Sequence, residues 1–171
     1  MVLINSDYYD GRNTLELEIP WVTPEAITWL DKRLTKKMSA VDFGTGGSTL
    51  FLARRCDHVI SMDNNPRWII NTREALRAKS LMNASVYDVS CIEECKSLVN
   101  RHFDVALIDC CNISRYDLAV YMRDRADIVV IDNYAADYVG NTDAVYTGWN
   151  VERYDDVHWQ GSGTKIYWRA V

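Results

Sequence analysis

The sequence predicts a doubly wound α/β fold, in which a mostly parallel sheet of seven strands carries helices on both faces. Two observations predict it. Short runs rich in Val and Ile alternate with segments that begin with helix-capping residues, and this alternation is typical of parallel strands joined by crossover helices. Near the C-terminus the alternation stops, and two strand-like runs follow each other directly.

Five apolar runs supply the predicted parallel strands. They are SAVDF (39–43), HVISM (58–62), ASVYD (84–88), DVALID (104–109) and DIVVID (127–132). Residues branched at Cβ favour extended backbone, and runs of this length fit buried strands. The two final runs, WNVERYD and TKIYWRAV, are joined through QGSG with no room for a crossover helix. We therefore expect these two strands to be antiparallel.

Residues that cap helices precede the segments between those runs. Thr23 and Asn65 are each followed by proline, which is favoured at the first position of a helix. Ser90 with Glu93 has the pattern of a capping box, and Ser114 stands before RYDLAVYMRDR. Each of these positions predicts the start of a helix.

Composition limits the class of protein. The chain has 171 residues, 48% of them hydrophobic, so we expect residues 1–171 to form a single domain. The net charge is −5 with no basic block, and no nucleic-acid partner is expected. No run has the length of a membrane span or the pattern of a leader. The five cysteines lack metal-site spacing, which predicts free thiols and a cytoplasmic location.

A glycine turn, DFGTGGST, follows the first predicted strand. Open α/β sheets bind ligands beyond the carboxyl ends of their strands, where glycine lets a ligand approach the backbone. The turn lacks the G-K-[ST] of a P-loop, and Thr49 replaces the third glycine of the dinucleotide pattern. Asp63 ends the second strand, where its carboxylate could bind both hydroxyls of a ribose. These features favour an adenosine-type ligand without pyrophosphate; the alternative is that the glycines only form a turn and Asp63 only caps a helix.

The same residues resemble the motifs of the class I S-adenosylmethionine-dependent methyltransferases. VDFGTGGST resembles the first motif of that family, ISMDNN the second and VYDVS the third, and FDVALIDCC and ADIVVIDNY resemble its fourth and fifth strand ends. The resemblance implies a Rossmann-like methyltransferase fold with S-adenosyl-L-methionine as cofactor. The cofactor-binding residues that it implies are Asp42, Gly44, Thr45, Gly46, Ser48, Asp63, Asn64, Asp88, Val89 and Asp109.

Two acids and an amide stand at the ends of the fourth and fifth predicted strands. Asp109, Asp132 and Asn133 should lie side by side there, and oxygen ligands of this kind suit Mg²⁺. The set is similar to the metal triad of the catechol-type O-methyltransferases. That subfamily has a lysine base three residues after the first aspartate, where this chain has Asn112, so Asp109 is the candidate catalytic base. The alternative is that these aspartates only end strands and cap helices.

The acceptor is expected to be a small molecule with a hydroxyl group. A chain of this length has no separate substrate domain, so the acceptor would be held by the strand-end loops and by residues 1–22, a possible lid. Aromatic residues that could form its walls are Tyr8, Tyr9, Trp21, Tyr134 and Tyr138. O-methylation is the leading interpretation, and the alternatives are an N-methyltransferase or a catalytically silent cofactor-binding module that serves a partner protein. The oligomeric state is not readable from the sequence.

Overall fold

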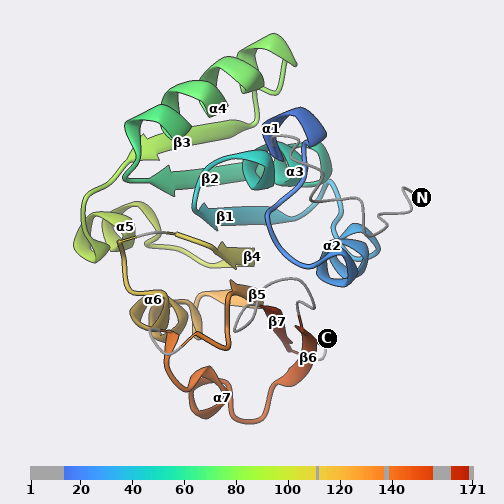
Figure 1. Ribbon diagram of the computed structural model, residues 1–171, viewed down its shortest axis with the longest axis vertical. Helices are drawn as coiled ribbons and strands as arrows, with labels where there is room; N and C mark the ends of the chain where they lie inside the picture. The colour runs from blue at the N-terminus through green and yellow to red at the C-terminus, as the bar shows by residue number, and fades with distance from the viewer. Residues whose placement is uncertain (1–13, 111, 137–138, 156–162, 170–171) are drawn as a thin grey trace.

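The computed structural model describes residues 14–110, 112–136, 139–155 and 163–169. Its strands form one seven-stranded sheet in the order β3-β2-β1-β4-β5-β7-β6 (Figure 1). The strands are β1 (Ser39–Phe43), β2 (His58–Asp63), β3 (Ala84–Asp88), β4 (Phe103–Ile108), β5 (Ala126–Asp132), β6 (Asn150–Asp155) and β7 (Gly163–Trp168).

The pairing of the strands confirms the predicted sheet. β1 to β5 are parallel to their neighbours, whereas β7 pairs antiparallel with both β5 and β6. Phe43 at the end of β1 lies opposite Ile108 at the end of β4, so the carboxyl ends of the central strands stop at one edge. The positions predicted for the five parallel strands are correct to within one residue, although β4 ends at Ile108 and leaves Asp109 in the loop that follows. The last predicted run is too long, because β7 ends at Trp168.

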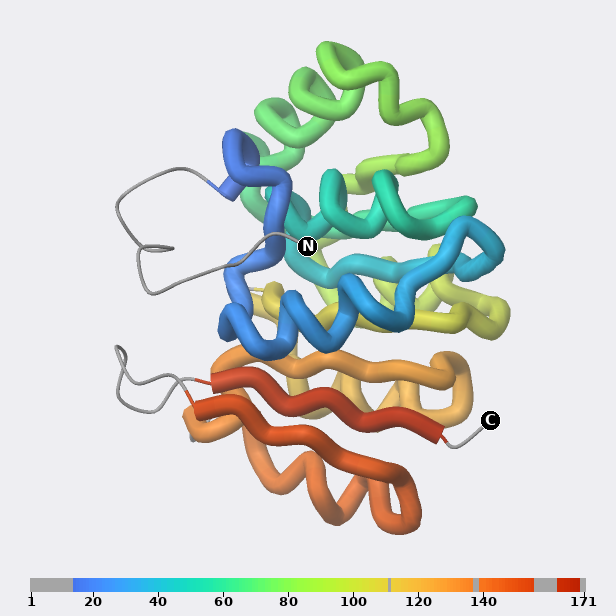
Figure 2. The backbone as a smooth tube through the Cα atoms, turned by 90° about the vertical axis from the view of Figure 1, so that its right-hand side faces the viewer, coloured from blue at the N-terminus to red at the C-terminus, as the bar shows by residue number. Residues whose placement is uncertain are grey.

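Helices cover both faces of the sheet, as predicted. They are α1 (Thr14–Leu17), α2 (Pro24–Asp31), α3 (Gly47–Arg55), α4 (Pro66–Ala78), α5 (Ile92–Leu98), α6 (Arg115–Met122) and α7 (Thr142–Val145). The helices α2, α3 and α4 pack on the face that Figure 2 turns toward the viewer, and α5, α6 and α7 pack on the other. None of the described helices has the length and apolarity needed to cross a membrane.

Alternate side chains of the strands build two apolar layers. Ala40 of β1 joins the layer under α2, α3 and α4, whereas its neighbours Val41 and Phe43 join the layer under α5 and α6. Successive strand residues point to opposite faces, so strands covered on both sides are apolar almost throughout. Among the polar side chains that the strands carry, Asp63 and Asp132 are the last residues of β2 and β5, at the carboxyl edge, where they can meet a ligand.

Helices begin directly after Thr23, Asn65 and Ser114, as predicted, and two of these residues also cap their helix with the side chain. The side chains of Asn65 and Ser114 accept hydrogen bonds from the backbone N–H groups of Arg67 and Asp117, which confirms them as caps. Thr23 precedes α2, but its side chain makes no capping hydrogen bond. Its hydroxyl is therefore left for another partner.

The predicted capping box at Ser90 is wrong in detail. Helix α5 begins at Ile92, two residues after Ser90, with Cys91 at the cap position. Glu94, not Glu93, accepts hydrogen bonds from the Ser90 backbone N–H (2.6 Å) and hydroxyl (3.1 Å). Because the helix starts later than expected, the glutamate that reaches back to Ser90 is the one four residues on.

Candidate functional site

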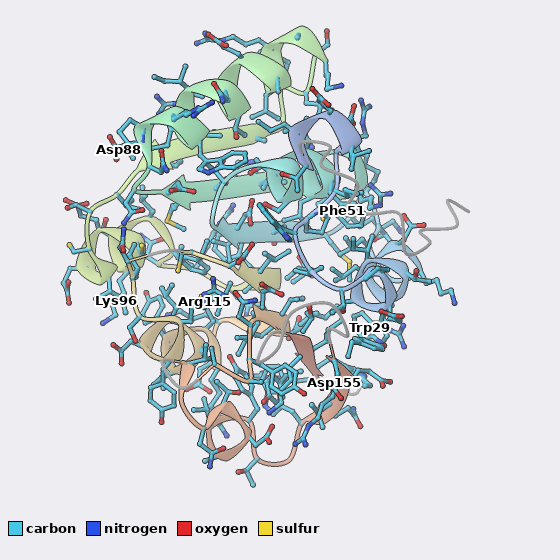
Figure 3. All side chains as sticks on the ribbon, in the orientation of Figure 1. Trp29, Phe51, Asp88, Lys96, Arg115 and Asp155 are labelled. Carbon is cyan, nitrogen blue, oxygen red and sulfur yellow. The ribbon has the colours of Figure 1, made fainter. Side chains whose placement is uncertain are left out.

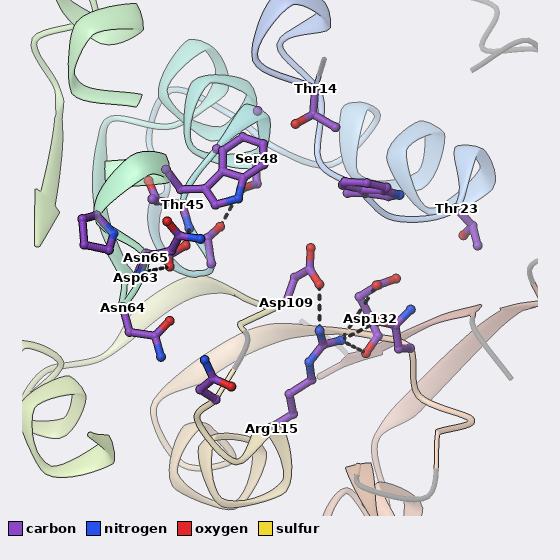
Figure 4. A pocket seen from close by; sticks show the side chains of 18 residues that line it. Thr14, Thr23, Thr45, Ser48, Asp63, Asn64, Asn65, Asp109, Arg115 and Asp132 are labelled. Atoms are coloured by element: carbon purple, nitrogen blue, oxygen red, sulfur yellow. Dashed lines mark hydrogen bonds and ion pairs between the residues drawn. The ribbon is translucent and has the colours of Figure 1, made fainter. Parts of the chain in front are cut away.

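A cavity of about 670 Å³ opens at the carboxyl edge of the sheet, where the ends of β1, β2, β4 and β5 meet the N-terminal segment (Figure 4). Nine of the predicted site residues line it: Gly44, Thr45, Gly46, Ser48, Asp63, Asn64, Asp109, Asp132 and Asn133. Three predicted site residues are absent from its lining: Asp42, Asp88 and Val89. The strand ends therefore bring most of the predicted residues together around one space.

The glycine turn between β1 and α3 depends on two close approaches. Gly44 has a φ of +122°, and a Cβ on it would lie 2.7 Å from the backbone oxygen of Asp109. A Cβ on Gly47 would lie 2.2 Å from the backbone oxygen of Ile19. Side chains at these positions would push β4 and the N-terminal segment away. Glycine thus closes the turn against the wall of the cavity formed by Asp109.

Asp42 supports the turn from behind. Its side chain is completely buried, and one carboxylate oxygen accepts hydrogen bonds from the hydroxyls of Ser48 (2.9 Å), Thr49 (2.7 Å) and Ser61 (3.2 Å). The other oxygen, Oδ1, is buried and has no hydrogen-bond partner in the part of the chain that the structure describes. Burial raises the pKa of Asp42 to about 7 against the opposing effect of the three hydroxyls. Asp42 thus lies behind the cavity wall, where its hydrogen bonds hold the glycine turn in place, and it does not line the cavity itself.

Asp63 lies at the end of β2 with both carboxylate oxygens on backbone donors. Oδ2 accepts from the Thr45 N–H (2.9 Å) and Oδ1 from the Asn65 N–H (2.8 Å). Burial raises the pKa of Asp63, and these hydrogen bonds oppose the rise. Each carboxylate oxygen can accept a second hydrogen bond, so the group can still bind ligand hydroxyls. Asn64 lines the cavity beside it.

The third predicted motif lies outside the cavity. Asp88 pairs in register with Asp63 on the next strand, but its side chain is exposed, and Figure 3 shows it at the periphery. Val89 is buried, and its backbone N–H donates to the backbone carbonyl oxygen of Asp63 at 2.9 Å. These two residues extend the sheet edge next to Asp63.

Aromatic side chains flank the cavity, and one of them was not predicted. Trp68, in the first turn of α4, lines the cavity beside Gly46. Its indole lies in an ordinary amphipathic helix, so no sequence pattern marks it. Of the predicted walls, Trp21 lines the cavity and Tyr134 does not. Tyr8, Tyr9 and Tyr138 lie outside the described residues.

Arg115 lies at the centre of the predicted metal ligands (Figure 4). One amino group, Nη2, donates to Asp109 Oδ1 at 3.0 Å, and the other, Nη1, donates to Asn133 Oδ1 at 3.1 Å and to the backbone oxygen of Asp132 at 2.6 Å. Nε donates to the backbone oxygen of Cys110. The described residues contain no cluster of three or more His, Cys, Asp or Glu that could hold a metal. A guanidinium thus supplies the positive charge expected of Mg²⁺.

One sequence signal could have identified Arg115. It is the first residue of α6, and a cation at the N-terminus of a helix opposes the helix dipole. Arg115 is nonetheless only 5% exposed. A buried cation in an unfavourable position needs acidic partners nearby, and Asp109 and Asp132 provide them. We call these residues together with Asn133 the acid–arginine cluster.

Both acids of the acid–arginine cluster hold protons more tightly than an ordinary aspartate. Burial raises the pKa of Asp109 well above its usual value, and the charge of Asp132 raises it further. Burial raises the pKa of Asp132 to about 6, while Arg115 opposes the rise. Asp132 Oδ1 also accepts a hydrogen bond from the Thr164 hydroxyl at 3.1 Å. Asp109 has the more exposed side chain, 24% against 9%, so it is the acid that a ligand can reach.

The fold is shared with solved methyltransferases. An rRNA methylase from Streptococcus thermophilus has a similar structure, with a TM-score of 0.70 at 16% sequence identity; the match covers 90% of this chain and 100% of that one. A precorrin-6y C5,15-methyltransferase from Geobacter metallireducens has a TM-score of 0.66 at 14% identity, and the match covers 84% of this chain and 86% of that one. A Streptococcus mutans protein, described as a methyltransferase and solved in complex with SAH, has a TM-score of 0.68 at 18% identity, covering 86% and 98%. No family model and no curated protein matches the sequence. The predicted class I methyltransferase fold is therefore confirmed.

Proposed function

We propose that this protein transfers a methyl group from S-adenosyl-L-methionine to a small acceptor, most simply to a hydroxyl oxygen. The observation that carries the proposal is the cavity itself: a glycine turn and a strand-end acid stand on one side of it, and a buried acid with a raised pKa stands on the other. The fold, shared with methyltransferases that act on several substrates, supports the reaction type.

The residues on the turn side suit the chemistry of the cofactor. Asp63 retains acceptor capacity for ribose hydroxyls, the Gly44–Gly47 turn exposes backbone, and Trp68 offers an aromatic surface. Among the described residues that line the cavity, Arg115 is the one basic side chain, and its donors point to protein oxygens. A pyrophosphate would find no cation there. Gly44, Thr45, Gly46, Ser48, Asp63 and Asn64 would hold S-adenosyl-L-methionine.

Asp109 is the proposed general base. When bound, the cofactor supplies an electrophilic methyl group, and the acceptor must lose a proton to attack it. A carboxylate with a raised pKa takes that proton more readily than an ordinary aspartate. Arg115 holds the carboxyl of Asp109 at the cavity wall through a hydrogen bond from Nη2 to Oδ1. Mg²⁺ is no part of this proposal, because the guanidinium already lies among the oxygens that would bind it.

The acceptor stays a small molecule in this proposal, although rRNA methylases share the fold. The test incubates the full chain with S-adenosylmethionine and three separate acceptor pools: small hydroxylated molecules, small amines and total RNA. S-adenosylhomocysteine should form fastest with the hydroxylated pool and at the same rate with a chelator present. Formation with RNA alone contradicts the small acceptor, and formation with no pool favours a silent cofactor-binding module.

A further inference from the structure

One polar group on the cavity wall has no partner among the described residues. The hydroxyl of Thr23 is buried, residue Thr23 being only 3% exposed, and it makes no hydrogen bond to that part of the chain. The hydroxyl makes no capping hydrogen bond to α2, and Thr23 lines the cavity. Burying a hydroxyl without a partner costs free energy, and in proteins such groups are nearly always satisfied. A bound ligand would provide the missing partner.

Thr23 is held next to the acid–arginine cluster. Its backbone N–H donates to the Thr164 hydroxyl at 3.0 Å, and that hydroxyl donates to Asp132 Oδ1 at 3.1 Å. In Figure 4, Thr23 lies on the side of Asp132 and across the cavity from Asp63. The free hydroxyl therefore belongs to the half of the cavity that faces Asp109.

This half of the cavity carries no surplus of positive charge. Asp109 and Asp132 stand there against the single guanidinium of Arg115. Asp63 adds a third carboxyl to the same cavity, and no described lysine or histidine lines it. An anionic molecule would find no unused cation there, whereas a group with N–H or O–H donors finds carboxyl oxygens that can accept.

We infer that this half of the cavity binds an acceptor that carries hydroxyl or amino groups and no negative charge, and that the Thr23 hydroxyl hydrogen-bonds to it. Thr23 is thus a specificity residue for the reaction, contributed by the N-terminal segment. The inference rests on the proposed function of the same cavity. The exposed ring of Trp21 lines the cavity two residues before Thr23, which favours an acceptor with an aromatic ring.

Three phenols that differ in one group test the inference. Tyramine is cationic, 4-hydroxyphenethyl alcohol is neutral and 4-hydroxyphenylacetate is anionic. Their binding to the full chain saturated with S-adenosylhomocysteine is measured by calorimetry or ligand-detected NMR. We expect the first two to bind and the acetate to bind at least about tenfold more weakly. Thr23→Val should weaken the binding of the neutral phenol about 3- to 10-fold, which is the effect of losing one hydrogen bond. The affinity for S-adenosylhomocysteine should stay unchanged.

Thr72→Val is the matched control. Thr72 of α4 is also buried, and its hydroxyl has no partner within the described ranges, but Thr72 does not line the cavity. Valine keeps the shape of threonine, so both variants should fold and keep or raise the melting temperature, and only Thr23→Val should change phenol binding. Equal binding of all three phenols, binding of none, or unchanged binding in Thr23→Val overturns the inference. If S-adenosylhomocysteine itself does not bind, the proposed function fails instead.

Discussion

The two halves of the cavity are held together by different forces. On the side of β1 and β2, backbone N–H groups and hydroxyls bind the carboxylates of Asp63 and Asp42. On the side of β4 and β5, Arg115 forms ion pairs with Asp109 and Asp132 in a buried cluster. Burial raises the pKa values of acids in both halves, but Asp42 does not line the cavity, whereas Asp109 does and can meet a ligand. The first half is thus suited to binding and the second to chemistry.

Replacing Asp109 should have the largest effect and should separate the two halves. We expect Asp109→Asn to lower turnover ~10²- to 10⁴-fold, because asparagine cannot accept the proton of the acceptor. S-adenosylhomocysteine affinity should stay within about threefold, because the other half holds the cofactor. Steady-state rates and calorimetry on the same preparation measure both. If Asp109→Asn lowered turnover and S-adenosylhomocysteine affinity by the same factor, binding and catalysis would not be divided between the two halves of the cavity.

Removing the cation from the acid–arginine cluster should destabilise the fold. Arg115→Met leaves two buried carboxyls without their counter-charge, and breaking a buried ion pair in this way costs about 3–5 kcal/mol. Urea unfolding followed by circular dichroism measures the loss. Arg169→Met, at an exposed arginine, is the control and should change stability by less than about 1 kcal/mol. If Arg115→Met also lowered the free energy of unfolding by less than about 1 kcal/mol, the ion pairs of Arg115 would contribute little to stability.

Asp42, the buried acid on the side of β1 and β2, should make the free energy of unfolding depend on pH. The pKa of Asp42 rises from 3.8 to about 7 in the folded protein, so the folded state holds a proton that the unfolded state releases. Its contribution to stability is therefore full below pH 3.8 and is lost as the pH rises toward 7. Between pH 5 and 8 the wild type should lose about 2–3 kcal/mol through this group.

Asp42→Asn isolates that contribution. Asparagine can still accept the hydroxyl hydrogen bonds, but it does not titrate. Its unfolding free energy should accordingly vary less between pH 5 and 8 than that of the wild type, whatever its absolute value. Denaturant titrations at four pH values provide the comparison. Parallel curves for the two proteins would show that Asp42 is ionised throughout.

The sequence predicted the binding half better than the reactive half. A glycine turn after a strand has a local signature, so Gly44 and Asp63 could be placed from their spacing alone. The convergence of Asp109, Asp132 and Asn133 also followed from the parallel order of the strands. Their partner Arg115 did not: its place at the start of α6 is a weak signal, and its burial depends on how the strand-end loop packs against that helix.

Some predictions lie beyond the structure or differ from its geometry. Asp88 ends β3 as expected, yet its exposed side chain does not line the cavity, since the outermost parallel strand lies too far to the side. Four of the cysteines are free thiols, and Cys111 lies outside the described residues. The single domain, the cytoplasmic location and the identity of the acceptor stay predictions, because neither the fold nor the cavity determines them.

The central claim is that the turn side of the cavity binds S-adenosylmethionine, and calorimetry of the wild type and Asp63→Ala tests it most directly. We predict binding of S-adenosylmethionine and none of NAD, and a loss of ~1.5 to 3 kcal/mol in Asp63→Ala, because charge-assisted hydrogen bonds to the ribose are removed. Asp88→Ala, which changes an acid outside the cavity, should bind within about threefold of wild type. Unchanged affinity in a folded Asp63→Ala protein, or binding of NAD in place of S-adenosylmethionine, would contradict the account.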